Sequence, residues 1–255
     1  MRPRRIVDLS APIESSPPGT PEFQRTTIEY WDHAAGAAEV EALFGVPPRL
    51  LRNGEGWTRD TVTLGTHNST HVDAPYHYNS IIQDRPAATI DELPLEMFIG
   101  PGVTLDFCDR ADGEAIDADD VQEALARGGH QLAAGEIVLV RTGRDAFYGQ
   151  PDYINRGPGV TAAATRWLYE RGIRVMGIDA WGWDRPLVTQ AQEALQRNAP
   201  GIFWEAHQVD LPYSQIERLV NLDQLPVDGF TVSCLPLRVV RASAAPARVV
   251  AIFED

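Results

Sequence analysis

The sequence predicts an α/β fold, a single domain of residues 1–255 built on a mixed β-sheet. Three observations lead to this prediction. Strand-like and helix-like segments alternate along most of the chain, the stretch from 136 to 179 has the order strand, helix, strand, and 255 residues suffice for one substantial core. The stretch 136–179 predicts a right-handed crossover that joins two parallel strands.

The expected strands are short apolar or alternating runs, at residues 4–10, 58–67, 102–107, 136–143, 173–179, 229–240 and 248–254. Two helices have clear boundary signals. The run IDADDVQEALARGG, residues 116–129, starts with aspartates and ends with glycine. The run GVTAAATRWLYERG, residues 159–172, has Thr161 as the expected N-cap.

Residues 11–60 are rich in proline, glycine and charge, with aromatic residues scattered through them. We expect a long loop-rich segment, interrupted by a short helix at 37–45 that ends at Gly45. A loop region of this length inside a domain is usually functional, for example as a lid or an oligomer contact.

Composition excludes several classes of protein. No apolar run is long enough to span a membrane, and the formal net charge of −14 disfavours nucleic-acid partners. The two cysteines, Cys108 and Cys234, lie far apart, which argues against a disulfide scaffold and a cysteine-based zinc site. The short apolar block at the start is soon followed by acidic residues, unlike a secretion signal, so we expect a cytoplasmic protein.

Half of the six histidines fall in LGTHNSTHVDAPYHY, residues 64–78, with the spacing His67-x3-His71-x-Asp73-x3-His77. In an extended chain the Cα atoms of His67 and His71 would be about 13 Å apart, too far for two imidazoles to bind one ion comfortably. We therefore expect a bend between them, and an extended chain afterwards that places residues 71, 73 and 77 on one side. Pro75 excludes a helix running through the cluster.

Two imidazoles and a carboxylate suit a divalent transition metal and leave positions for water and substrate. Asp73 has two oxygens and can bridge two ions. His77 is one imidazole more than a three-ligand site needs, so it is the expected general acid/base. The alternative is chance clustering on a surface loop.

The run HNSTHVDAPYH resembles the signature H-x-G-T-H-x-D-x-P-x-H of the metal-dependent cyclase family, which includes bacterial kynurenine formamidase and isatin hydrolase. Ser69 stands where the signature has glycine. Further segments resemble family landmarks in the family's order, among them IVDLS, DELPLEMFIGPGVTLDF, VMGIDAWGWDRP and IERLVNLDQLP.

The resemblance implies a swivelling β/β/α fold and a hydrolase of amide or lactam C–N bonds that uses one or two divalent ions, Zn²⁺ or Mn²⁺. It implies that His67, His71 and Asp73 are metal ligands and that His77 is the acid/base. Family members also use a later histidine and a later acidic or amide residue, as ligands or as catalytic partners. His207 fits as a catalytic residue and Glu217 as a metal ligand, although their spacing is ten rather than the usual twelve. Alternatives to Glu217 are Gln208, Asp210 and, best, Glu205.

Trp181, Trp183 and Trp204 either line a substrate pocket or pack in the core or an interface. Asp179 and Asp184 either orient metal-binding imidazoles or cap turns. His33, in the long early segment, is a candidate substrate contact, because related enzymes use such a segment at a neighbouring subunit's active site. His130 is expected to face solvent.

No phosphate-binding loop, dinucleotide fingerprint or serine-hydrolase elbow is present. The sequence therefore predicts a metal-dependent hydrolase that uses a metal-activated water on an amide, lactam, formamide or lactone of a small aromatic molecule. The alternative is a metal-dependent cyclase or dehydratase acting on a polyketide-like intermediate. The expected assembly is a homodimer or homotetramer without nucleic-acid or membrane partners.

Overall fold

The structure is a computed structural model that describes residues 5–254. The chain divides into two compact units: residues up to Pro12 together with Ser69 onward form the first, and Ile13–Asn68 form the second. Each unit is described by itself below. The first holds the large sheet and most of the predicted site residues.

The main sheet of the first unit has nine described strands in the order β1-β15-β13-β7-β9-β11-β12-β4-β14. The strands β7, β9, β11 and β12 pair in parallel, and the other neighbours pair antiparallel, so the predicted mixed sheet is confirmed. Their bounds are β1 Arg5–Asp8, β4 His71–Asp73, β7 Ile99–Asp106, β9 Ile137–Arg141, β11 Val175–Ile178, β12 Ser214–Glu217, β13 Phe230–Ser233, β14 Ala244–Pro246 and β15 Val250–Phe253. Two short pairs lie outside this sheet: β5 Ile81–Ile82 with β6 Arg85–Pro86, and β8 Ala115–Ile116 with β10 Gly159–Val160.

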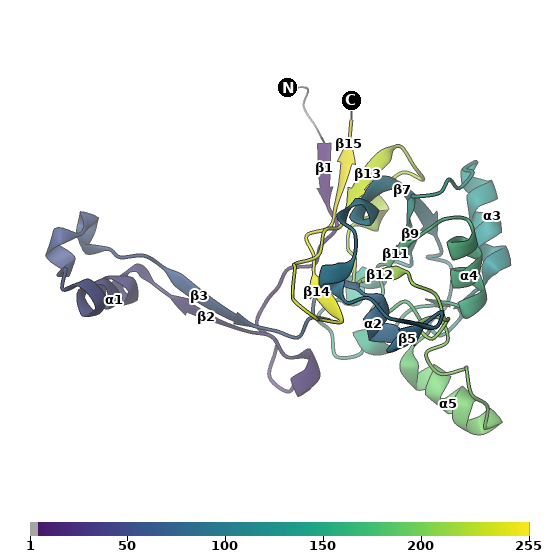
Figure 1. Cartoon of the computed structure of the whole chain (residues 1–255), viewed down its shortest axis with the longest axis horizontal. Coiled ribbons are helices and arrows are strands. Elements are labelled where there is room, and N and C mark those ends of the chain that lie inside the picture. Colours follow the sequence, from purple (N-terminus) through teal and green to yellow (C-terminus); the bar gives the residue numbers. More distant parts are fainter. Residues whose placement is uncertain (1–4, 255) are drawn as a thin grey trace. The chain divides into compact units, whose positions relative to one another are not determined.

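Helices α3 (Ala118–Gly128) and α4 (Ala162–Glu170) are the crossovers that allow the parallel pairing, and Figure 1 shows them side by side against the sheet. Both begin at the predicted caps. The Asp117 carboxylate accepts from the backbone of residues 119 and 120, and the Thr161 hydroxyl accepts from the Ala164 nitrogen. Helix α3 ends at Gly129, whose φ of 67° is easily adopted by glycine. The predicted strand-helix-strand unit joining parallel strands is thus confirmed.

Alternation along the strands separates two apolar cores. Val138 and Val140 of β9 belong to the core under α3 and α4, whereas Ile137 and Leu139 belong to the core on the opposite face. Val72 and Ile216 also belong to this second core. The residues that flank Val72 and Ile216 in sequence therefore point to the helix-covered face.

The second unit contains more regular structure than predicted. Strands β2 (Thr27–Trp31) and β3 (Arg59–Thr63) form an antiparallel hairpin, and α1 (His33–Phe44) lies between them in sequence. Strand β2 was not predicted, because period-two alternation in TIEYW was hidden among charged and proline-rich neighbours, whereas β3 lies within the strand expected at 58–67. The predicted helix end at Gly45 is confirmed, with φ 67° there, but α1 begins four residues earlier than expected, after the N-cap Asp32.

Several other boundaries differ from the predictions. The strand expected at 229–240 ends at Ser233, because the chain soon reaches Pro236, which has no N–H to donate to a ladder. The first described strand begins at Arg5, and residue 4 of its predicted range lies outside the described residues. Helix α5 (Leu187–Arg197) and strand β12 were not predicted, whereas β4 lies in the stretch after His71 that was expected to be extended. Within residues 5–254, no helix is both long and apolar enough to cross a membrane.

Candidate functional site

The site is built on two neighbouring antiparallel strands, β4 and β12. His71 lies opposite Glu217, and Asp73 lies opposite Gln215. Because Val72 and Ile216 point into the core on the other face, the side chains of His71, Asp73 and Glu217 share the helix-covered face. All three are buried.

The three side chains converge. The His71 Nε2 atom lies 3.3 Å from Asp73 Oδ1 and 3.5 Å from Glu217 Oε2. One donor atom from each of the three lies within 4.8 Å of the others. The Nδ1 atom of His71 is 2.9 Å from the carbonyl oxygen of Ser69, which can only accept, so Nδ1 donates to it and Nε2 is the nitrogen that faces the carboxylates.

The predicted bend between His67 and His71 is present. Ser69, which stands at the glycine of the signature, has a left-handed backbone with φ 57°. Its hydroxyl donates to the Ala11 carbonyl at 3.0 Å, and the Thr70 hydroxyl donates to the Arg218 carbonyl at 2.6 Å. These two hydrogen bonds hold the bend against the segment that follows β1 and against the residue that follows β12.

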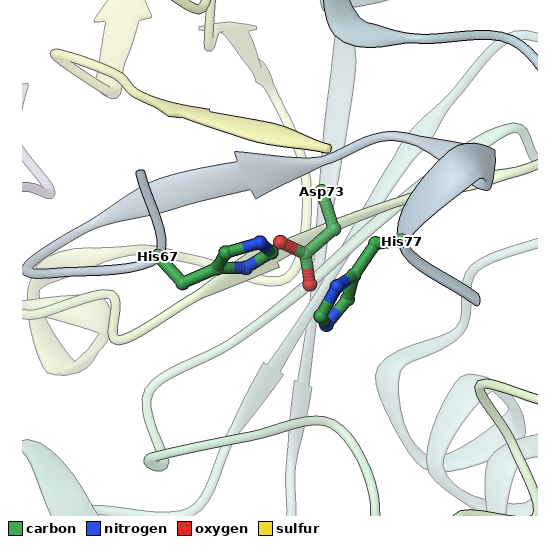
Figure 2. A group of neighbouring side chains, drawn as sticks. All are labelled: His67, Asp73 and His77. Carbon is green, nitrogen blue, oxygen red and sulfur yellow. The ribbon is translucent and has the colours of Figure 1, made fainter. Parts of the chain in front are cut away.

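His67 and His77 form a second donor group with Asp73, and Figure 2 shows the two imidazoles on either side of the carboxylate. One donor atom from each lies within 4.8 Å of the others. The sequence predicts that His77 continues an extended strand, and this prediction is wrong. His77 lies on the short helix α2 (Pro75–Tyr78), because Pro75 occupies the first helical position, where its missing N–H costs nothing.

His207 lies on the loop after α5 and faces the same carboxylates. Its Nε2 atom is 3.5 Å from Glu217 Oε1 and 3.9 Å from Asp73 Oδ2. Its Nδ1 atom lies 2.6 Å from Asp184 Oδ2. Burial alone lowers the pKa of His207, but the hydrogen bonds to Asp184 and Glu217 outweigh it and raise the pKa to about 10.

The two acidic candidates left open by the sequence occupy different places. Glu217 lies between His71 and His207, as described above. Glu205 instead accepts from the Ala162 nitrogen and lies 3.5 Å from the Arg185 guanidinium. The geometry therefore favours Glu217 as the acidic member of the donor set.

The three tryptophans differ in their surroundings. Trp204 is half-buried and stacks on the His207 ring with 4.5 Å between centroids, and its edge contact with His77 has a centroid distance of 5.1 Å. Trp183 is fully buried, and its indole N–H donates to Thr165, so it packs in the core. Trp181 is covered by the Arg218 guanidinium, 4.8 Å from the ring centroid.

The remaining predicted residues have structural contacts. His33 begins α1, and its Nδ1 atom lies 2.8 Å from the Gly56 carbonyl. Asp179 accepts from the Thr142 and Gly143 backbone, so it caps a turn and contacts no imidazole. It lines a surface cavity of about 390 Å³ that includes none of the predicted ligands. His130 is paired with Glu136 and Asp228.

Sequence reasoning missed Gln190. It is buried on α5 and bonds to both Asp184 and the loop that carries His207. A glutamine on an amphipathic surface helix gives no signal in a single sequence, because such a residue usually faces solvent.

The donor set fits a divalent transition metal. Neutral imidazole nitrogens and carboxylate oxygens are the ligands that zinc and manganese take, and Asp73 belongs to both groups of three. Two carboxylates buried beside imidazoles are also costly without positive charge to balance them. The site is therefore a candidate for one ion, or for two that share Asp73.

Known proteins resemble this chain over most of its length. The Cyclase family, described as "Putative cyclase", matches residues 7–185. The chain is 28% identical over 259 residues to kynurenine formamidase of Paracidovorax citrulli, covering 97% of this chain and 96% of that one. It is 28% identical over 204 residues to isatin hydrolase of Roseibium aggregatum, covering 75% and 73%. The solved structure of isatin hydrolase A from Ralstonia solanacearum superposes with a TM-score of 0.76 at 26% identity, covering 98% and 92%.

Proposed function

The chain belongs to the Cyclase family, and from this premise we propose that it is a metal-dependent hydrolase of C–N bonds other than peptide bonds. Its substrate is a small aromatic molecule with an amide, lactam, formamide or lactone group. The names of the relatives, a formamidase and a hydrolase, support the reaction type. The observation that carries the proposal is the buried convergence of His71, Asp73 and Glu217.

The chain's own residues would hold one or two ions, Zn²⁺ or Mn²⁺, as follows. His71, Asp73 and Glu217 would hold one ion, and His67 would help to hold a second ion beside Asp73. A divalent ion in such a site polarises a carbonyl and lowers the pKa of water towards neutrality. His207, predicted as a catalytic residue, would face such an ion with Nε2, since that nitrogen lies near both carboxylates.

Proton transfer falls to His77. Its ring lies beside those of His207 and Trp204 and next to the Asp73 group, so it is within reach of a substrate bound there. As an imidazole outside the first donor set it can take a proton from water and deliver it to the leaving nitrogen or oxygen. Trp204 supplies a flat face for an aromatic substrate, and we propose Trp181 as a further substrate contact.

The second unit suggests how the protein assembles. It exposes large apolar side chains, namely Phe23, Tyr30, Trp31, Leu43, Phe44, Leu50, Trp57 and Val62. Exposed apolar surface of this extent is typical of protein interfaces. We therefore propose a homodimer or homotetramer in which His33 contacts substrate at a partner's site. We also propose that each chain acts as one functional domain and that the protein is cytoplasmic. Mass measurement in solution tests the assembly.

The metal assignment is tested by elemental analysis of the purified protein and a His71→Ala variant. We expect at least one divalent ion per wild-type chain and a clear loss of metal in the variant. His130→Ala, which removes a histidine outside the site, is the control and keeps its metal. Equal metal content in His71→Ala and wild type would contradict the ligand assignment.

The reaction is tested by supplying the metal-loaded protein with a panel of formanilides, lactams and aryl lactones. We expect turnover of at least one class, lost when the metal is removed by a chelator and restored when it is added back. Failure on every class, together with conversion of a β-ketone chain, would instead indicate a cyclase or dehydratase.

A further inference from the structure

A short segment, Gly182–Asp184, contacts two members of the proposed site at once. The Trp183 nitrogen donates to Glu217 Oε1 at 3.0 Å, and a Cβ atom added to Gly182 would lie 3.4 Å from the same oxygen. Asp184, the next residue, bonds to His207. The indole of Trp183 is held in the core by its bond to Thr165. A core-anchored segment therefore fixes a carboxylate from β12 and an imidazole from a distant loop.

Both carboxylate oxygens of Asp184 accept hydrogen bonds from the His207 loop. Its Oδ2 accepts from His207 Nδ1 at 2.6 Å and from the His207 backbone nitrogen at 3.1 Å. Its Oδ1 accepts from the Ala206 nitrogen at 3.0 Å. Because a carboxylate can only accept, the Nδ1 atom of His207 carries a hydrogen and its Nε2 is turned to Glu217 and Asp73.

Gln190 completes this arrangement from helix α5. An amide side chain can donate and accept at the same time. Its Nε2 donates to Asp184 Oδ1 at 2.8 Å, and its Oε1 accepts from the Trp204 nitrogen at 2.9 Å. Trp204 has a left-handed backbone with φ 61°, a conformation that a bulky residue keeps only when its surroundings hold it. Its ring is the one stacked on His207.

We propose that Asp184 and Gln190 are positioning residues that set the tautomer and orientation of His207 and hold Trp204 against it. Neither residue is placed to touch the substrate. Asp184 acts through His207, and Gln190 acts through Asp184 and the Trp204 backbone. The inference rests on the proposed role of His207 at the metal, but not on which substrate is hydrolysed.

The test is the affinity of the folded protein for Zn²⁺ alone, measured by competition with a chromophoric chelator. Asp184→Asn keeps the size of the side chain but replaces an accepting oxygen with an NH₂ group, and we expect Zn²⁺ binding to weaken about ten- to hundredfold. Asp179→Asn is the matched control. Asp179 is equally buried and also accepts from backbone nitrogens, but it contacts no histidine, so its variant should bind Zn²⁺ within about threefold of wild type.

A second readout follows His207 itself. In Zn²⁺-loaded protein labelled with ¹⁵N-histidine, one Nδ1–H resonance should disappear in His207→Gln. The chemical shift of that resonance should change in Asp184→Asn and remain unchanged in Asp179→Asn. Gln190→Met, which removes both amide bonds at similar size, should move it less than Asp184→Asn and still weaken Zn²⁺ binding. This variant also keeps the proposal testable where Asp184→Asn fails to fold.

Equal loss of Zn²⁺ affinity in Asp184→Asn and Asp179→Asn would reduce the effect to general destabilisation and overturn the proposal. So would unchanged Zn²⁺ affinity in Asp184→Asn, or an unmoved His207 resonance in both Asp184→Asn and Gln190→Met. Wild-type protein that binds Zn²⁺ in this pattern yet hydrolyses nothing would contradict the proposed function while leaving the positioning role in place.

Discussion

Glu217 lies directly opposite His71 on the neighbouring antiparallel strand, and Glu217 Oε2 is 3.5 Å from His71 Nε2. The two residues are 146 positions apart in the sequence, yet the register of β4 and β12 fixes their meeting. Cross-strand neighbours on one face have Cβ atoms about 5 Å apart, so backbone pairing alone brings both side chains within reach of one ion. The strands therefore act as a rigid frame for the site.

Glu217→Gln should weaken metal binding at least tenfold, because it replaces a charged donor with a neutral one at nearly unchanged size. Glu205→Gln is the matched control, since Glu205 pairs with Arg185 away from the donor set. Elemental analysis after dialysis measures both. Loss of metal in Glu205→Gln with retention in Glu217→Gln would reverse the assignment.

His77→Ala should lower kcat by about 10²- to 10⁴-fold, the usual contribution of a general acid/base, with a much smaller change in KM. Metal content should fall little, because His71, Asp73 and Glu217 remain as a complete donor set. Tyr76→Ala, an exposed neighbour on the same short helix, should keep its activity. A kcat within threefold or so of wild type in His77→Ala would exclude it as the proton carrier.

Trp204→Ala should raise KM for an aromatic substrate by about tenfold, because stacking adds roughly 0.5–1.5 kcal/mol beyond area burial. The KM for an aliphatic amide of similar length should change much less. Steady-state kinetics on the two substrates make the comparison. Equal increases for both would mean that Trp204 shapes the loop but does not bind the aromatic ring.

His130 gives the fold a pH-dependent contribution outside the site. Burial lowers its pKa, but hydrogen bonds to Glu136 and Asp228 outweigh burial, and the pKa lies above the ordinary 6.5. The folded state therefore binds this proton more tightly than the unfolded state. The stabilisation is complete below pH 6.5 and is lost as the pH rises through the raised pKa.

His130→Gln should accordingly lower the Tm most at about pH 6, by a few degrees, since such a partly exposed pair contributes about 1 kcal/mol or less. The difference in Tm from wild type should shrink as the pH rises from 6 through the raised pKa of His130. Thermal melts across this range measure it. A difference that grows with pH would mean that the neutral ring, rather than its charge, is what the fold uses.

Local signals in the sequence were sufficient for helices α3 and α4. Asp117 caps the start of α3 and Gly129 caps its end, and Thr161 caps the start of α4. These ends were predictable because capping depends on atoms only a few residues away. The bend before His71 was predictable for the same reason. Strand β12 was not predicted, since it is four residues long and is stabilised by pairing with distant neighbours. The short helix carrying His77 was also missed, because Pro75 reads equally as a break or as a start.

By itself the sequence determined the mixed α/β fold class and the chemistry of the donors, because side-chain type and local spacing are written directly in the chain. The tertiary structure decided which distant acid joins the histidines. Glu217 and Glu205 are equivalent as residue types, and only strand register places one beside His71 and leaves the other against Arg185. It also decided the role of Gln190, whose two hydrogen bonds exist only where α5, Asp184 and the His207 loop meet.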